Sequence, residues 1–324
     1  MASRPTDSEI RRVPKQPRRG RGRLEVYLFG RMRVDSDGQE LPGLTCAKAR
    51  ELLAFLLLHR GRAHRREAVA DRLWGETGCA DPRKTLRQAL WRLQSGLGER
   101  PPLVEALEGN WIQVSPAARA WVDVHRFDAA WEEVQNAAHR QLSSTVWGRA
   151  EEALGLYSGE LLEGSSWDWC LGERERLREL YFAMADEVLG RYRATGEYTP
   201  GIRLGFEILR RDPSRESTHR RLMHLHALAG DRTAALRQFE RCVAALREEF
   251  GVAPGQPTRE LFETIRDDAM SGDAVSARTD THEHPPPVSS ILQGLHQLRA
   301  LLSEARREVH LEIEAIEKVL EIRK

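Results

Sequence analysis

The sequence predicts a mainly α-helical chain that begins with a small α+β domain, continues as a domain of helical repeats and ends in one long coiled-coil helix. Three observations predict this class. Residues 24–116 follow the order strands, three helices, hairpin; residues 123–270 carry almost only helical patterns, with a 34-residue repeat; and residues 288–324 keep an apolar heptad pattern.

Charge is divided unevenly along the 324 residues. The net charge is +1, but residues 1–116 contain 22 Lys and Arg against 14 Asp and Glu, and the remainder contains 28 against 35. A basic first third beside an acidic remainder indicates a polyanionic partner for the first part only. Residues 1–23 hold eight of the basic side chains. This segment is expected to be a disordered basic arm, which either tracks phosphates or only increases solubility.

Several classes of protein are not expected. The four cysteines are too widely spaced for a zinc motif and form no disulfide pattern. No apolar run approaches the roughly 18 residues of a membrane span, and the Arg-rich start is unlike a secretory signal, so we expect a cytoplasmic protein without a membrane partner. Motifs for phosphate loops, zinc proteases and nucleophile elbows are missing from the sequence. We therefore expect no enzyme, no catalytic residue, no cofactor and no metal site.

Strand signals come first in the N-terminal domain and helix signals follow. Apolar and polar side chains alternate over Leu24–Val34, which predicts one strand, and a turn at Asp37-Gly38 leads to a short strand near 39–41. Helical patterns follow over about 48–61 and over Arg65–Trp74. These elements would form the scaffold for the third helix.

The third helix has the clearest start signal. Asp81 is expected to be its N-cap and Pro82 its first helical residue, and Gly98 is expected to end it. Apolar residues recur along one face, at Leu86, Leu90, Leu93 and Leu97. Strands at 103–107 and 111–114 then predict a hairpin.

The opposite face of this helix is the candidate site. A helix that lies between a two-helix unit and a hairpin has the layout of a winged helix, whose recognition helix enters the major groove of double-stranded DNA. Arg, Lys and Gln read base edges there, and basic flanks contact phosphates. We expect DNA contacts from the helix residues Arg83, Lys84, Arg87, Gln88, Trp91, Arg92 and Ser95, and from the wing residues Asn110 and Trp111. The alternative is an ordinary solvated helix face.

Residues 123–270 contain a helical repeat. The turns at Gly196 and Gly230 lie 34 residues apart, which is the period of a tetratricopeptide (TPR) helix pair. Apolar residues recur at the same offset, as in the pairs Val188 and Leu222, Leu189 and Met223, Ile202 and Leu236, and Leu209 and Val243. Such stacks present surfaces for ligands, so this domain either senses an effector or is a purely structural contact surface.

The C-terminal segment has a heptad pattern. After a polar, Pro-containing linker at 271–287, nine of the ten a and d positions between Val288 and Val319 are apolar. This pattern predicts a coiled coil that makes a homodimer or higher homo-oligomer. The alternative is a helix that folds back on the repeats.

Longer stretches resemble known families. "KARELLAFLLLHRGRAHRREAVADRLWG" resembles the first two helices of the OmpR-type winged-helix DNA-binding domain, and "DPRKTLRQALWRLQSGLG" resembles its recognition helix. "ALGLYSGELLEG", "DWCLGERERLRELYFAMADEVL" and "LRRDPSRESTHRRLMHLHALAGDRTAALRQFERCVAALREEFGVAPGQPTRELFETI" resemble the bacterial transcriptional activator domain. The combination is similar to the antibiotic-regulatory-protein (SARP) class of transcriptional activators.

The resemblance implies an activator that binds promoter DNA and contacts RNA polymerase, partly through the loop before the recognition helix, here about 75–80. It also implies a winged helix at 24–116 and an activator domain at 117–270. The patterns above add the arm at 1–23, the linker at 271–287 and the coiled coil at 288–324, of which the arm and the coiled coil lie outside the family pattern. Two features depart from the family. The usual basic "SRLRR" end of the recognition helix is replaced by residues 91–95, "WRLQS", and the Gly-Tyr wing tip by Asn110-Trp111.

One rival function remains. The chain would be a protein-interaction adaptor that does not bind DNA, with both the winged helix and the repeats contacting proteins. The reduced basic character of the recognition helix would be its sign. Salt dependence separates the two functions, because phosphate contacts weaken by orders of magnitude between about 50 and 200 mM salt.

Overall fold

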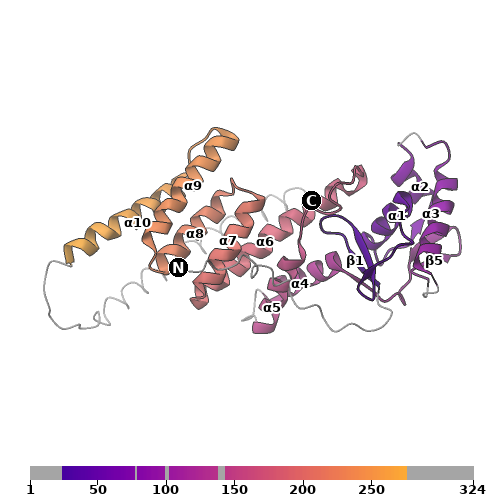
Figure 1. Cartoon of the computed structure of the whole chain (residues 1–324), viewed down its shortest axis with the longest axis horizontal. Helices are drawn as coiled ribbons and strands as arrows, with labels where there is room; N and C mark the ends of the chain where they lie inside the picture. Colours follow the sequence, from indigo (N-terminus) through magenta and orange to yellow (C-terminus); the bar gives the residue numbers. More distant parts are fainter. Residues whose placement is uncertain (1–23, 77–78, 99–101, 138–142, 276–324) are drawn as a thin grey trace, which may run out of the picture. The chain divides into compact units, whose positions relative to one another are not determined.

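The computed structural model describes residues 24–76, 79–98, 102–137 and 143–275. These residues are mainly helical, with a small α+β region at their N-terminal end (Figure 1). A first compact unit ends at Arg266, and the sites named below belong to it. The predicted basic arm at 1–23, the coiled-coil helix at 288–324 and the linker beyond residue 275 lie outside the described residues.

Two small sheets frame the N-terminal domain. The first has the strand order β3-β2-β1-β7, in which β1 and β7 are parallel and the other pairs antiparallel. The second has the order β4-β6-β5 and is antiparallel throughout. The strands are β1 (Leu24–Tyr27), β2 (Arg33–Ser36), β3 (Gln39–Glu40), β4 (His64–Arg65), β5 (Val104–Leu107), β6 (Trp111–Val114) and β7 (Ala120–Val122).

The single strand predicted over Leu24–Val34 is wrong. The chain instead forms β1 and β2, which pair with each other in the register Val26 to Val34. The turn between them includes Gly30 at φ 72°, a conformation that glycine adopts without steric cost. The alternation continues through the turn because both strands face the same core, so the pattern alone could not reveal it.

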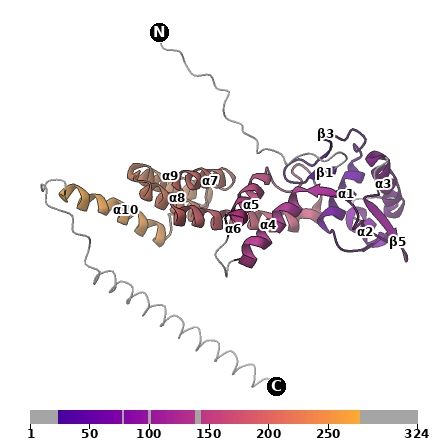
Figure 2. The ribbon, with the colours of Figure 1, turned by 90° about the horizontal axis from the view of Figure 1, so that it is seen from below.

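Three helices pack against these sheets. They are α1 (Ala47–Leu58), α2 (Arg66–Trp74) and α3 (Pro82–Leu97). Helix α1 is apolar enough to be buried along most of its length, with the run from Leu52 to Leu57 in the core. Helices α1 and α2 both contact α3, and Figure 2 shows the three grouped with β5. The predicted positions of all three helices therefore agree with the structure to within a few residues.

Strand β7 and helix α4 (Asp123–Ala137) join the N-terminal domain to the helices that follow. Strand β7 adds to the edge of the first sheet, where Val122 pairs with Val26, and the chain enters α4 directly afterwards. Farther along, Phe29 makes an isolated bridge with Leu161. One continuous core cluster includes buried residues from Leu24 to Leu225, so the two predicted domains share their apolar interior.

The second part of the chain is built only from helices among its described residues. After α4 these are α5 (Ser144–Leu156), a 3₁₀ turn (Asp168–Cys170), α6 (Leu171–Thr195), α7 (Tyr198–Arg211), α8 (Glu216–Leu228), α9 (Arg232–Phe250) and α10 (Gln256–Val275). Helices α6 to α9 pack consecutively, each on the next (Figures 1 and 2).

Burial follows the 34-residue repeat of this helical part. Val188 and Leu222 are both fully buried, and Ile202 and Leu236 are both half-buried. Equivalent positions in successive helix pairs therefore face equivalent surroundings, as expected for TPR-like packing.

The predicted start of the linker needs a correction. The sequence predicts a linker from Ser271, but helix α10 continues to Val275. Residues 271–275 contain a Gly but no Pro, and the prolines that would stop a helix stand only at 285–287. Polarity alone therefore placed the boundary too early.

Candidate nucleic-acid interface

Helix α3 begins as its sequence predicts. The Asp81 side chain accepts a hydrogen bond from the backbone N–H of Lys84 at 2.9 Å, and Pro82 occupies the first turn. Gly98 follows the helix at φ 70° and ψ −149°, a conformation that glycine adopts without steric cost. Both ends are therefore fixed by local side-chain and backbone chemistry.

The two faces of α3 differ sharply in burial. Leu86, Ala89, Leu93 and Leu97 are buried, on the side that packs against α1 and α2. All seven residues expected to contact DNA are exposed on the other side: Arg83, Lys84, Arg87, Gln88, Trp91, Arg92 and Ser95. The described parts of the chain leave this face uncovered, so it is accessible to a partner.

The basic side chains on this face differ in their own contacts. Arg83 lies 3.3 Å from the Glu67 carboxylate of α2, in an exposed ion pair. Within the described part of the chain, Lys84 and Arg87 make no ion pair. Exposed ion pairs contribute about 0–1 kcal/mol, so Arg83 can exchange Glu67 for a phosphate at little cost.

Arg92 has a neighbour of a different kind, the Cys46 thiol just before α1. Burial raises the pKa of Cys46, but the Ala49 amide and the Arg92 guanidinium outweigh that effect, so the net shift of the pKa is downward. The Arg92 side chain is thus directed toward the start of α1. Of the basic residues on α3, Lys84 and Arg87 are the least engaged within the protein.

Trp91 is unusual on a polar helix face. Its side chain is 66% exposed, the largest exposure among the big apolar residues described. An indole in this position offers a flat apolar surface and one N–H donor to a partner.

The wing hairpin places Asn110 and Trp111 differently. Gly109 and Asn110 both have positive φ, 73° and 68°, which forms the tight turn between β5 and β6. Asn110 is exposed at the tip. Trp111 is half-buried, and the Arg65 guanidinium lies 5.5 Å from its ring centroid. Arg65 therefore belongs with the wing, where sequence spacing did not place it, because only the pairing of β4 with β6 brings the two together.

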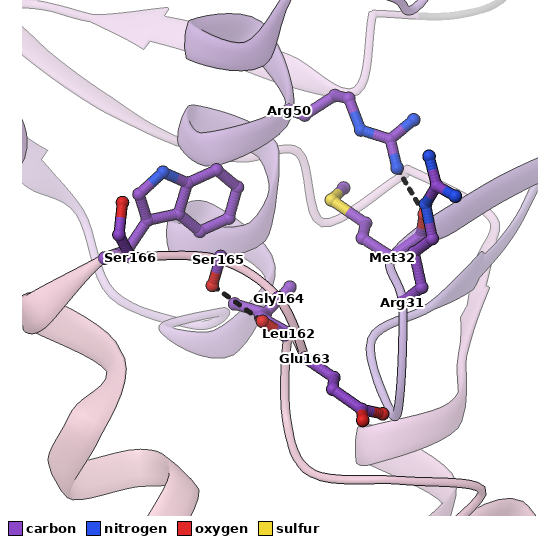
Figure 3. A pocket seen from close by; sticks show the side chains of 9 residues that line it. Arg31, Met32, Arg50, Leu162, Glu163, Gly164, Ser165 and Ser166 are labelled. Carbon is purple, nitrogen blue, oxygen red and sulfur yellow. Dashed lines mark hydrogen bonds between the residues drawn. The ribbon is translucent and has the colours of Figure 1, made fainter.

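A hollow of about 300 Å³ lies beside the N-terminal sheet, between the β1–β2 turn and the loop after Leu162 (Figure 3). Its walls include Arg31 and Arg50, and Arg50 donates a hydrogen bond to the Met32 carbonyl. The Glu163 carboxylate points away from Arg50 in Figure 3. Burial, followed by the effect of Arg31, lowers the pKa of Arg50, while Glu40 opposes the change. Glu40 thus partly compensates the positive charge of Arg50.

Neither a metal cluster nor a membrane span is found among the residues that the structure describes. The residues that it describes contain no group of three His, Cys, Asp or Glu side chains arranged to hold a metal ion. Across the described ranges, the helices are too short or too polar to span a bilayer.

Comparison with known proteins supports a regulatory role. Residues 122–266 match the family model described as the bacterial transcriptional activator domain. The transcriptional regulatory protein MoaR1 of Mycobacterium tuberculosis is 25% identical over 256 residues, which cover 75% of this chain and 79% of that protein. The protein of the same name from Mycobacterium bovis matches over the same length with the same identity.

The fold has a solved counterpart. Mycobacterium tuberculosis EmbR, solved in complex with a low affinity phosphopeptide, superposes with a TM-score of 0.63 at 22% identity. The match covers 76% of this chain and 66% of that chain, so this chain spans slightly less than two thirds of EmbR. Residues 122–266 thus match the bacterial transcriptional activator domain, and three quarters of the chain is similar to transcriptional regulatory proteins.

Proposed function

We propose that this regulator binds specific sequences in double-stranded DNA through helix α3 and the β5–β6 wing. One observation carries the proposal: every polar and basic residue on the outer face of α3 is exposed, while its apolar stripe is buried. A recognition helix needs this division, because it must be held rigidly from behind and remain uncovered in front.

The side chains divide naturally between two tasks. Lys84 and Arg87, which have no ion pair in the described structure, would neutralise phosphates and fix the register of the helix. Gln88 follows Arg87 on the exposed face. The donor and the acceptor of its side-chain amide complement the acceptor and the donor that adenine presents in the major groove. Asn110 at the wing tip, with Arg65 behind it, would contact the DNA backbone.

The remaining expectations form part of the same proposal. The chain would activate transcription by contacting RNA polymerase, partly through the loop at 75–80. Its functional segments would be the winged helix at 24–116 and the activator domain at 117–270. Residues 288–324 would join two or more copies in a homo-oligomer.

The test is a titration of the full chain with fluorescent duplexes at several salt concentrations. If α3 contacts about four phosphates, the logarithm of the association constant should fall with the logarithm of salt concentration with a slope of about −3.6. A duplex selected from genomic DNA should bind at least about a thousandfold more tightly than a random one. Weak binding with a slope near zero on every duplex would contradict the proposal.

The adaptor function has one specific observation in its favour, which is the 66% exposed Trp91. Exposed tryptophans are enriched at the centres of protein interfaces. In that case Trp91→Ala would abolish binding to the protein partner, and every duplex would bind weakly, with a salt slope near zero. The selected-duplex titration therefore separates the two functions.

A further inference from the structure

A second basic surface lies in the activator domain, far along the chain from α3. A pocket of about 290 Å³ opens between α6 and α8. Its lining consists of Leu189, Gly190, Arg193, Ser217, Arg220, Arg221, His224 and Leu225. Three of these residues are arginines and one is a histidine, and none of the eight is a carboxylate. We call this the α6–α8 pocket.

Neighbouring helices hold two of its arginines in place. Arg221 donates a hydrogen bond to the Asp186 carbonyl at 2.7 Å, and its Nε lies 3.5 Å from the Asp186 carboxylate. Arg220 donates a hydrogen bond to the Thr258 hydroxyl at 3.2 Å. Both side chains are half-buried. Guanidinium groups that are already oriented lose little conformational entropy when they bind a ligand.

The positive charge of the pocket is only partly compensated. Asp186 is shared, because Arg215 also approaches its carboxylate, at 3.0 Å. Arg193 is exposed and makes no ion pair with any residue that the structure describes. Burial lowers the pKa of His224, and Arg193 and Arg220 lower it further. The positive charges of Arg193 and Arg220 thus act on the His224 ring inside the pocket.

We propose that the α6–α8 pocket binds the phosphoryl group of a small phosphorylated molecule. The planar guanidinium of arginine donates paired hydrogen bonds to two phosphate oxygens. A cluster of several arginines suits a phosphoryl group, with its charge of about −2, better than it suits a ligand with a single carboxylate. A volume of about 290 Å³ is at the lower end of the range for small-ligand sites, which favours a compact ligand.

The hollow in Figure 3 is a weaker candidate for the same chemistry. Arg31 and Arg50 line it, but Glu163 is also among its lining residues, and Glu40 lines the adjoining hollow together with the same two arginines. An anion would therefore gain less there than in the α6–α8 pocket, where the lining residues are basic or uncharged.

The test uses ribose 5-phosphate as the probe, with ribose and inorganic phosphate for comparison. The full chain is titrated by calorimetry, and the His224 ring is followed by NMR after assignment with His224→Gln. We expect ribose 5-phosphate to bind and to raise the pKa of His224, because the phosphate offsets the field of the arginines. Inorganic phosphate should bind more weakly and shift the same signal, and ribose should not bind.

Substitutions locate the site. Arg193→Gln should weaken binding of ribose 5-phosphate about tenfold, since it removes one charge-assisted contact, and Arg220→Gln should do the same. Arg203→Gln is the matched control, because Arg203 is exposed on α7 and lies outside the pocket.

Three results would overturn the proposal. They are no binding of either phosphate probe, equal weakening by Arg193→Gln and Arg203→Gln, or a His224 shift produced by duplex DNA but not by ribose 5-phosphate. The last result would make this surface a contact for the DNA backbone. None of them bears on whether α3 recognises DNA, so the two proposals can fail separately.

Discussion

Among single residues, Arg87 is the clearest candidate for a phosphate contact. It is exposed on the outer face of α3 and forms no ion pair with the described residues, whereas Arg83 faces Glu67 and Arg92 is directed toward Cys46. An arginine without an ion pair inside the protein loses no such interaction when it binds a phosphate. Its removal should therefore affect binding to any duplex.

Arg87→Ala should weaken binding to a selected and to a random duplex alike, by about tenfold, and should make the salt slope shallower by about 0.9. Fluorescence titrations at 50 and 200 mM salt measure both effects. Arg237→Ala, at an exposed position of α9, serves as the control and should leave the affinity unchanged. If Arg87→Ala and Arg92→Ala both leave binding intact, α3 is not the DNA-contacting helix.

Gln88→Ala should behave in the opposite way. A side-chain amide reads a base edge and carries no charge, so its loss should cost about 1–3 kcal/mol on the selected duplex and almost nothing on a random one. Comparison of the two affinities for each variant gives the result directly. An equal loss on both duplexes would show that Gln88 contacts the backbone instead.

The sequence located the candidate face but not the contacts within it. Steps of 100° per residue placed the seven outer side chains on one side of α3, and all seven are exposed. Sequence spacing could not show that Glu67 pairs with Arg83, or that Arg65 covers Trp111, because these partners come from other elements. Periodicity describes one helix at a time, and tertiary contacts decide which of its side chains remain available.

At the scale of elements, Asp123 is the residue that joins the N-terminal sheet to the helical part. It is 1% exposed, and its carboxylate accepts hydrogen bonds from the backbone N–H groups of Leu28 and Phe29 at 2.8–2.9 Å and from Val124 at 2.7 Å. It therefore fixes the end of β1 and the start of α4 at once.

Asp123→Ala should lower the free energy of unfolding by about 2–4 kcal/mol, because three buried N–H groups lose their acceptor. Denaturant titration followed by circular dichroism measures the change. Glu132→Ala, at an exposed position of the same helix, should change the stability by less than about 0.5 kcal/mol. Similar effects of the two variants would mean that Asp123 contributes little to the junction.

The same carboxyl should make stability depend on pH. Burial raises the pKa of Asp123 to about 6, although the backbone N–H groups that it accepts from oppose the shift. The folded chain then takes up a proton at a higher pH than the unfolded chain, so the contribution of Asp123 to stability grows as the pH falls from about 7 to 4.5 and is smallest above pH 6.

Asp123→Asn removes this titration. Relative to the variant, the wild-type chain should therefore gain thermal stability between pH 7 and pH 4.5. Melting curves of both proteins at the two pH values give the comparison, and other titrating groups cancel between them. A difference that stays constant with pH would place the pKa of Asp123 near its ordinary value.

Elements that depend on distant pairing were the ones that the sequence did not reveal. Helix α3 was predicted well because its cap, proline and apolar stripe are all local. Strand β7 is three residues long and exists because it pairs with β1, nearly 100 residues earlier in the chain. The turn at Gly30 is stabilised in the same way, by hydrogen bonds from Gly30 N–H to the Glu160 carbonyl and from Leu162 N–H to the Leu28 carbonyl.

At the scale of the whole molecule, the shared core bears on how the regulator works. The buried cluster extends from the β1 region through α1 and α3 into α6 and α8 without interruption. Glu51 of α1 reinforces it by accepting hydrogen bonds from the indole N–H groups of Trp74 and Trp169, at 2.7 and 3.1 Å. The candidate DNA-binding domain and the activator domain thus share one core. The sequence predicted two separate domains, because its strand and helix patterns change between them.

The segment at 288–324 is the remaining determinant of the proposed assembly. Its a and d positions are apolar at nine of ten sites, and such a seam is stable only when another helix covers it. We expect the full chain, with a mass of 36.9 kDa per copy, to form a dimer or larger oligomer. A chain that ends at residue 287 should contain fewer copies per oligomer.

Light scattering coupled to size exclusion measures both masses. Leu302→Asp together with Ile316→Asp should reproduce the effect of the deletion, because both change a positions, and Arg307→Ala at an f position should not. Loss of the oligomer should also weaken binding to DNA with two half-sites much more than binding to one half-site, since the second contact is no longer intramolecular. Equal masses for the full and shortened chains would mean that the heptad seam is covered within one copy.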